Sequence, residues 1–257
     1  ESEYPVFASP DSPTWKVGDD RVRGFSTVKH RVPMQSLDNT YNQSELVEFD
    51  ARLRRLLDVD EPAYLVEPKI DGLAISVTYE NGTYRRAVTR GDGEKGDDVT
   101  ENVRTIRTLP EQLEGKDHPK LIEIRGEIYM TREEFERINR EREANGKERF
   151  MNPRNLASGT LKQLNAELVA ERRLEIVCYG VGAIEGFSFS QQHEFRDAFK
   201  DWGLPVVERS WQVTGIEAAW EAVEELDALR ADVAYPTDGA VLKLDDLDSQ
   251  AEAGSTS

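Results

Sequence analysis

The sequence predicts an α+β fold built mainly of antiparallel sheets flanked by helices. Runs with alternating apolar residues and runs with helix-capping signals follow one another without the regular β–α alternation of a parallel α/β sheet. An Asn-Gly pair at 81–82 separates two alternating runs, which is typical of a two-residue β-hairpin turn. The 257 residues suit one large domain or two small ones, and a hydrophobic content of 38% is enough for a core.

Each element follows from a local signal. Asn42 with Glu45, Thr131 with Glu134 and Thr214 with Glu217 have the spacing of capping boxes, so each pair should open a helix. Ser190 is a further expected cap, and Pro153 suits the first turn of a short helix. In chain order we expect an extended stretch with several prolines over 1–40, a helix over 42–57, a strand over 63–70, a hairpin of 73–80 and 83–89, a glycine-rich loop at 91–96, a strand over 121–130, a helix over 131–144, a short helix from 153, a strand over 174–184, helices over 190–202 and 214–230, and a strand over 239–244.

Several classes of protein are excluded by composition. No apolar run approaches the roughly 18 residues that a membrane span needs. The first residues carry no basic region and no signal-peptide core, so we expect a cytoplasmic protein without a membrane partner. Cys178 is the only cysteine, which rules out a disulfide within the chain and a cysteine-rich zinc site. Its apolar neighbours predict a buried strand residue.

The net charge of −17 argues against duplex DNA binding by a broad basic footprint. The acidic groups could lie on faces away from DNA, or the source could live in high salt, where repulsion is screened. The 10 Lys and 23 Arg form a lysine-poor balance that favours the second interpretation.

Four short motifs carry the functional prediction. They are residues 67–72 (EPKIDG), 89–93 (TRGDG), 125–129 (RGEIY) and 238–243 (DGAVLK). A Lys-x-Asp-Gly alone should occur by chance in roughly one chain in twenty of this length. The four motifs in this order resemble those of lysine-adenylating ligases. Residues 30–39 (HRVPMQSLDN) and 150–162 (FMNPRNLASGTLK) narrow the resemblance to the NAD+-dependent DNA ligase family, over nearly the whole chain.

A nucleophilic lysine must lose its proton, and at its ordinary pKa of about 10.4 only about 0.04% of a lysine is neutral at pH 7. Burial at a strand end favours the neutral amine, whereas carboxylates such as Asp71 and Glu67 favour the ammonium. A divalent cation near the amine reverses that effect and neutralises phosphate charge. The motif therefore implies a metal, and Mg²⁺ suits carboxylate and phosphate oxygens.

The resemblance implies a nucleotidyltransferase (ATP-grasp-like ligase) core in which Lys69 is adenylated, with Asp71 and Lys243 as further catalytic residues. It implies that Glu67 and Tyr179 bind adenine, as an edge contact and a stacking ring. Glu127 would hold the ribose or the metal, and Gly72 would allow backbone to approach a ligand. Arg90 and Arg154 could pair with phosphate. Ser36 and Leu37 would line the pocket, while Lys162 stands where the family often has arginine, so its role is less defined.

The implied reaction is an adenylyl transfer from NAD+ to Lys69, and then from Lys69 to the 5′-phosphate of nicked duplex DNA, with release of nicotinamide mononucleotide. We expect residues 1–257 to be the adenylation domain of a longer bacterial ligase that acts on the nucleoid. Residues 10–14 resemble the end of a nicotinamide-binding subdomain, and residues 254–257 resemble the stretch before the last nucleotidyltransferase motif. The OB-fold, zinc-finger and helix–hairpin–helix regions would lie outside this fragment, which we expect to be a poorly active monomer.

Two alternatives stay open at this point. One is an ATP-dependent ligase or a capping-type nucleotidyltransferase, which shares the lysine chemistry. The other is a catalytically inactive nucleotide-binding fragment. The long matches over 30–39 and 150–162 argue against the first, and an intact Lys69 argues against the second.

Overall fold

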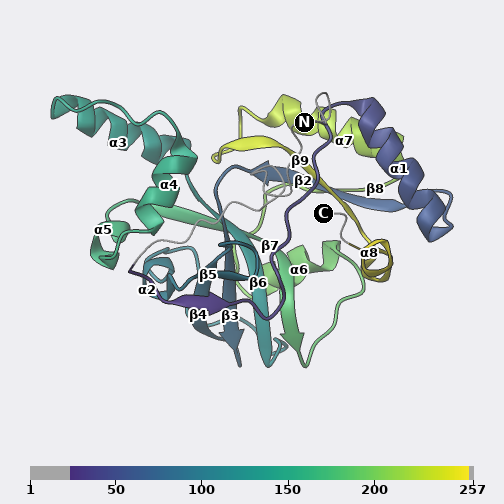
Figure 1. The fold of residues 1–257 in the computed structure, drawn as a ribbon, viewed down its shortest axis with the longest axis horizontal. Coiled ribbons are helices and arrows are strands. Elements are labelled where there is room, and N and C mark those ends of the chain that lie inside the picture. Colours follow the sequence, from purple (N-terminus) through teal and green to yellow (C-terminus); the bar gives the residue numbers. More distant parts are fainter. Residues whose placement is uncertain (1–23, 255–257) are drawn as a thin grey trace, which may run out of the picture.

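Antiparallel sheets form the centre of the protein. A computed structural model describes residues 24–254, so the expectations for residues 1–23 and 255–257 lie outside the described part. Within it, the strands form sheets of order β4-β3-β6-β7, β8-β2-β9 and β1-β5. Every strand pairing in these sheets is antiparallel, and helices lie around them (Figure 1), so the predicted α+β class is confirmed.

The four-stranded sheet contains the predicted hairpin. Its strands are β3 (Leu73–Glu80), β4 (Thr83–Thr89), β6 (Leu121–Met130) and β7 (Leu174–Glu185). Asn81 and Gly82 connect β3 to β4 with positive φ angles of 49° and 75°, as a two-residue hairpin turn requires. A large apolar cluster packs on this sheet and includes Phe199 of helix α6 (His193–Asp201) and Leu161 of helix α4 (Pro153–Leu161), both fully buried.

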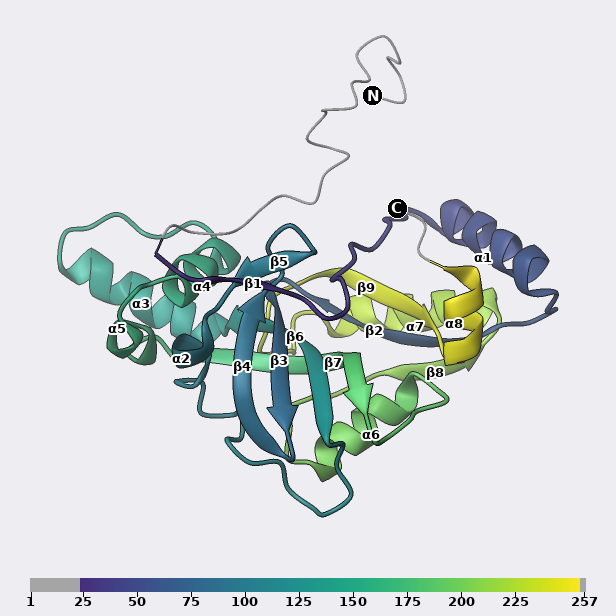
Figure 2. The same cartoon turned by 60° about the horizontal axis from the view of Figure 1, so that its bottom comes forward.

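The three-stranded sheet carries two of the four motifs. It comprises β2 (Ala63–Ile70), β8 (Trp211–Thr214) and β9 (Thr237–Leu244), with β2 in the middle. A second apolar cluster joins Tyr64 and Val66 of β2 to helices α1 and α7. These two helices lie beside this sheet and α3 lies at the other end of the molecule (Figure 2). Because side chains alternate along a strand, burial of Tyr64 and Val66 leaves Glu67 and Lys69 for the opposite face.

The helices confirm most of the predicted starts. Asn42 and Thr131 cap α1 and α3 by accepting from the backbone of the residue three positions on, and Asn152 does the same for α4, with Pro153 in its first turn. The helices are α1 (Gln43–Leu57), α2 (Thr100–Val103), α3 (Arg132–Ala144), α4 (Pro153–Leu161), α5 (Ala166–Ala170), α6 (His193–Asp201), α7 (Ile216–Leu229) and α8 (Leu247–Ala253).

Two predicted caps are wrong. Ser190 precedes α6 by three residues and instead donates from its backbone N–H to the Glu194 carboxylate at 2.7 Å, because Gln192 is held by a backbone hydrogen bond to Asp245. Thr214 is the last residue of β8, paired with Ala63, so α7 begins after it. Both misses involve contacts between segments far apart in sequence, Gln192 with Asp245 and Thr214 with Ala63.

The segment before the first helix is also fixed by a distant partner. β1 (Thr27–Lys29) pairs with β5 (Lys95–Asp97), so Lys95 and Gly96, which were predicted to belong to the glycine-rich loop, lie in a strand instead. Gly91 and Gly93 do form a turn with positive φ angles. Cys178 is buried in β7 as predicted. Among the described helices, none has both the length and the apolar character needed to cross a bilayer.

Candidate adenylation site

Five of the predicted site residues come from four strands of the two larger sheets. Lys69 and Glu67 lie on β2, Lys243 on β9, Glu127 on β6 and Tyr179 on β7. The β2–β9 register places Lys69 opposite Gly239 and Glu67 opposite Val241. Tertiary pairing therefore brings together motifs that are up to 176 residues apart in sequence.

Lys69 is held by a carboxylate that the sequence reasoning quoted but did not assign. The Lys69 ammonium donates to both oxygens of Asp238, at 2.7 and 2.9 Å. The two side chains retain 35% and 38% exposure, so solvent screens the pair and a ligand can reach it. Asp238 belongs to the 238–243 motif, and its place in that motif was the sequence signal that could have marked it as a site residue.

Lys243 does not point at open solvent. Its ammonium donates to Glu67 at 2.7 Å and to the backbone carbonyl of Tyr179 at 3.0 Å, and it lies 5.2 Å from the centre of the Tyr179 ring. The Glu67 and Lys243 side chains are 7% and 17% exposed. The structure thus links the predicted adenine contacts, Glu67 and Tyr179, through the second lysine.

Glu127 is surrounded by cations. Burial raises the pKa of its carboxyl to about 8, while Arg154, Arg90 and Lys69 oppose that rise, as does a hydrogen bond from the Gly72 backbone. Glu127 as a whole residue is partly buried, so part of its surface still meets solvent. Three positive side chains around one carboxyl make a region suited to phosphate oxygens.

Arg154 and Arg90 are positioned differently. The Arg154 guanidinium donates to Asp71 at 3.0 Å and is otherwise exposed. The Nε of Arg90 is buried and makes no hydrogen bond to any described residue. Its backbone is fixed by a hydrogen bond to Ala74 and by the Gly93 turn. A buried guanidinium nitrogen without a partner needs an acceptor, and an anionic ligand would supply one.

Glycine is required at position 72 for a different reason from the predicted one. A Cβ at this position would lie 2.3 Å from the Ile128 carbonyl oxygen and 2.9 Å from the Glu127 Cγ. The close approach that requires glycine is therefore between β3 and β6. It also lets the Gly72 N–H reach the Glu127 carboxyl.

The Ser36–Leu37 loop is exposed, with Leu37 at 59%. Within the described residues, neither side chain makes a hydrogen bond or ion pair to the other candidate residues. The preceding segment is anchored by the Met34 N–H on Gly93 at 2.8 Å and by Arg125, which donates to the Val32 carbonyl at 2.6 Å. Arg125 is 8% exposed and was noted in the sequence only as part of its motif.

The donor set fits Mg²⁺ only with help from a ligand. In residues 24–254 no group of three His, Cys, Asp or Glu side chains could hold a metal ion alone. Glu127 and the neighbouring Asp71 offer carboxylate oxygens among cations. Mg²⁺ usually keeps several waters and is bound by one or two carboxylates plus substrate phosphates, which matches this arrangement.

Comparison with known proteins places the chain in the class of ligase nucleotidyltransferase domains. More narrowly, residues 22–257 match the family described as "NAD-dependent DNA ligase adenylation domain", and the chain belongs to this family. It is 54% identical to DNA ligase 1 of Opitutus terrae over 100% of this chain and 39% of that protein. It is 45% identical to a DNA ligase of Coxiella burnetii over 99% of this chain and 38% of that protein.

The chain thus spans less than two fifths of the length of these relatives. Among solved structures, an archaeal ATP-dependent RNA ligase shares 16% identity with a TM-score of 0.43, covering 82% of this chain and 44% of that chain.

Proposed function

We propose that this chain transfers AMP from NAD+ to Lys69 as the first half of DNA nick sealing. The observation that carries the proposal is the convergence of Lys69, Arg90 and Arg154 around Glu127. Family membership supports NAD+ as the AMP donor. The region offers one amine for attack and several cations for the phosphates next to it.

Each of these residues has a distinct role in the transfer of AMP to Lys69. Lys69 Nζ leaves Asp238, loses a proton and attacks the α-phosphorus of NAD+, which forms a P–N bond and breaks the bond to nicotinamide mononucleotide. Arg90 and Arg154 balance phosphate charge, and Asp71 orients Arg154 through their 3.0 Å contact. Mg²⁺, held by Glu127 together with the phosphates, would supply further charge neutralisation.

The Glu67–Lys243–Tyr179 group would bind the adenosine half. Tyr179 offers a ring for stacking and Glu67 an acceptor for the exocyclic amine. Lys243 would exchange its contact with Glu67 for the transferred phosphate. Gly72 acts by holding Glu127, and Ser36 and Leu37 would close over the nucleotide from their anchored loop.

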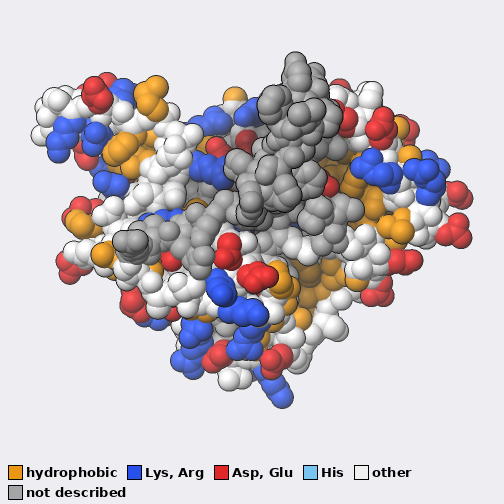
Figure 3. Space-filling view, in the orientation of Figure 1, with side chains coloured by type: hydrophobic (Ala, Val, Ile, Leu, Met, Phe, Trp, Pro, Cys, Tyr) orange, Lys and Arg blue, Asp and Glu red, His pale blue; other side chains and the backbone are white. Residues whose placement is uncertain are grey.

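The later steps concern the whole protein. We propose that residues 1–257 form the adenylation domain of a longer cytoplasmic ligase, which passes AMP from Lys69 to the 5′-phosphate of nicked duplex DNA. Basic and acidic side chains are interspersed on the face seen in Figure 3, without a broad basic patch over its described atoms. That distribution supports DNA being gripped mainly by other parts of the ligase. A monomer remains our prediction.

Intact-mass measurement tests the first step. After long incubation with NAD+ and Mg²⁺, the chain should gain an AMP adduct, and Lys69→Ala should not. Lys200→Ala, at an exposed lysine of α6, is the matched control and should keep the adduct. A parallel incubation with ATP should give no adduct. An adduct that survives Lys69→Ala, or one that forms from ATP alone, would contradict the assignment.

A further inference from the structure

A cavity lies on the face of β2 opposite to the one that carries Glu67 and Lys69. It has a volume of about 130 Å³ and is lined by Pro68 of β2. Because side chains alternate along a strand, Pro68 points away from the face that carries Glu67 and Lys69. Strand β8 pairs with β2 only as far as Val66, opposite Trp211, so the edge of β2 beyond this point has no strand beside it there. The cavity is therefore separate from the candidate adenylation site.

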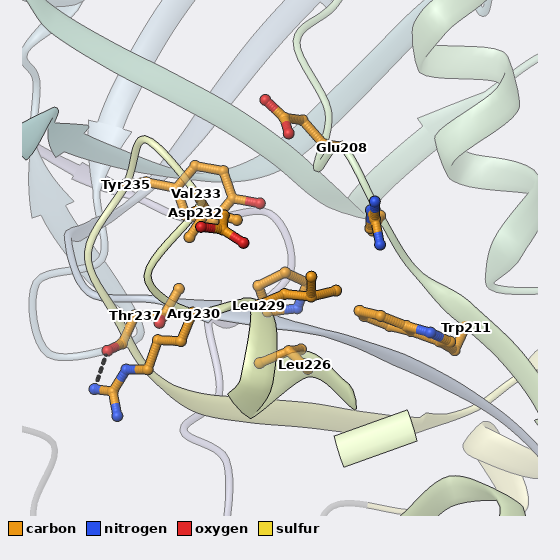
Figure 4. Close-up of a pocket in the computed structure, with 11 residues that line it drawn as sticks. Glu208, Trp211, Leu226, Leu229, Arg230, Asp232, Val233, Tyr235 and Thr237 are labelled. Carbon is orange, nitrogen blue, oxygen red and sulfur yellow. Dashed lines mark hydrogen bonds between the residues drawn. The ribbon is translucent and has the colours of Figure 1, made fainter. Parts of the chain in front are cut away.

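The walls combine flat apolar side chains with charged ones. Figure 4 shows Trp211, Leu226 and Leu229 on one side of the cavity and Tyr235 with Val233 on the other. Tyr129 packs edge-to-face against the Tyr235 ring, with 5.7 Å between ring centres and an interplanar angle of 76°. Two aromatic side chains and a proline make a slot that suits a planar ring.

Two buried hydroxyls line this cavity without a hydrogen-bond partner. Tyr235 is 4% exposed and Thr237 is 6% exposed. Among the described residues, neither Tyr235 Oη nor Thr237 Oγ1 makes a hydrogen bond, although the Glu208 backbone lies near the Tyr235 hydroxyl. Buried polar atoms without partners are uncommon in folded proteins because their lost hydration is not replaced. Both hydroxyls can donate and accept, so a ligand polar group could satisfy them.

The charged residues around the cavity balance one another. Arg209 and Arg230 are matched by Glu208 and Asp232. Arg230 already donates to the Thr237 carbonyl at 2.5 Å. Since its two positive and two negative side chains leave no net charge, the site favours a neutral molecule over an ion.

We propose that this cavity binds a neutral, single-ring aromatic molecule with one hydroxyl or carboxamide group. The volume is close to that of apolar protein cavities, about 150 Å³, that take up benzene. The ring would lie between Trp211 and Tyr235, and its polar group would reach the Tyr235 and Thr237 hydroxyls. Binding here would be independent of the adenylation activity, because the lining residues lie on the opposite face of β2 from Glu67 and Lys69.

NMR titration tests the site with phenol and benzamide as probes, and with toluene as a ring that lacks the polar group. The Trp211 indole N–H resonance should shift saturably with phenol and benzamide, with Kd on the order of 1 mM. Toluene should bind at least about fivefold more weakly, because it leaves both hydroxyls unsatisfied. The proposal would be overturned if toluene and phenol bound equally well, or if neither polar probe gave a saturable shift up to about 20 mM. The cavity would then simply hold water.

Variants locate the binding groups. Tyr235→Phe combined with Thr237→Val should weaken phenol binding at least about tenfold while the unliganded melting temperature does not fall, since no protein hydrogen bond is lost. Tyr129→Phe is the matched control, because it removes a hydroxyl from the ring that packs edge-to-face on Tyr235 and should leave phenol affinity unchanged. Unchanged affinity in the double variant, or an equal loss in the control, would refute the site. If the double variant does not fold, the phenol–toluene comparison in the natural sequence decides.

Discussion

The buried pair between Lys243 and Glu67 should stabilise the fold as a unit. The two charged groups are 2.7 Å apart and the Glu67 side chain is 7% exposed. At an effective dielectric constant of about 20, unit charges at this distance attract by about 6 kcal/mol, much of which offsets their desolvation. Removal of one partner of a buried pair typically costs about 3–5 kcal/mol, because the other charge is left uncompensated.

Lys243→Met should therefore lower the free energy of unfolding by about 3 kcal/mol, the low end of that range, because the lysine side chain retains 17% exposure. Glu67→Gln should cost less, about 1–2 kcal/mol, because the ammonium keeps the Tyr179 carbonyl at 3.0 Å and access to water. The double variant should cost less than the sum of the two, with a coupling of about 1–3 kcal/mol.

Urea denaturation at pH 7 measures all four proteins of this double-mutant cycle. Lys200→Met, at an exposed lysine, is the control and should change the unfolding free energy by less than about 0.5 kcal/mol. Additive single effects would refute the argument that each charge is held in place by the other. So would a Lys243→Met variant as stable as the natural protein.

Three further predictions concern Glu127, Gly72 and the overall charge. Because the folded-state pKa of Glu127 is raised from 4.5 to about 8, its proton stabilises the fold at low pH and that contribution is lost as pH rises through about 8. A complete shift would correspond to about 5 kcal/mol, and with partial exposure of Glu127 we expect roughly 2–3 kcal/mol. In metal-free buffer, Glu127→Gln should therefore flatten the pH dependence of the urea unfolding free energy between pH 5 and 9. The control Glu133→Gln, at an exposed residue, should leave that pH dependence unchanged. Gly72→Ala should destabilise the fold by at least about 2 kcal/mol, because its Cβ would lie 2.3 Å from the Ile128 carbonyl oxygen. Gly159→Ala, in α4, should be neutral or stabilising by roughly 0.5–1 kcal/mol, because a Cβ there would meet no other side chain within 4 Å. Loss of stability at both positions would contradict the contact argument. With a net charge of −17, the melting temperature should rise between low salt and about 1 M KCl as repulsion is screened, and a flat or falling curve would favour an ordinary acidic domain.

The sequence alone determined the features that depend on local chemistry. The helix starts at Asn42 and Thr131 were predictable because a capping side chain bonds within its own turn. The β3–β4 hairpin was predictable because Asn81 and Gly82 adopt the positive φ angles of its turn. The candidate residues themselves were predictable because their motifs occur in a fixed order, a signal that needs no coordinates.

Tertiary structure decided what depends on pairing between distant segments. The starts of α6 and α7 differ from the prediction where Gln192 is hydrogen-bonded to Asp245 and where Thr214, in β8, is paired with Ala63. The partners of the two lysines, Asp238 and Glu67, depend on the register of β9 against β2, which no local pattern encodes. The need for glycine at position 72 likewise comes from the Ile128 carbonyl across the sheet. Hydrogen bonding within a turn is a property of a few consecutive residues, whereas ion pairing and close packing are set only when the strands have met.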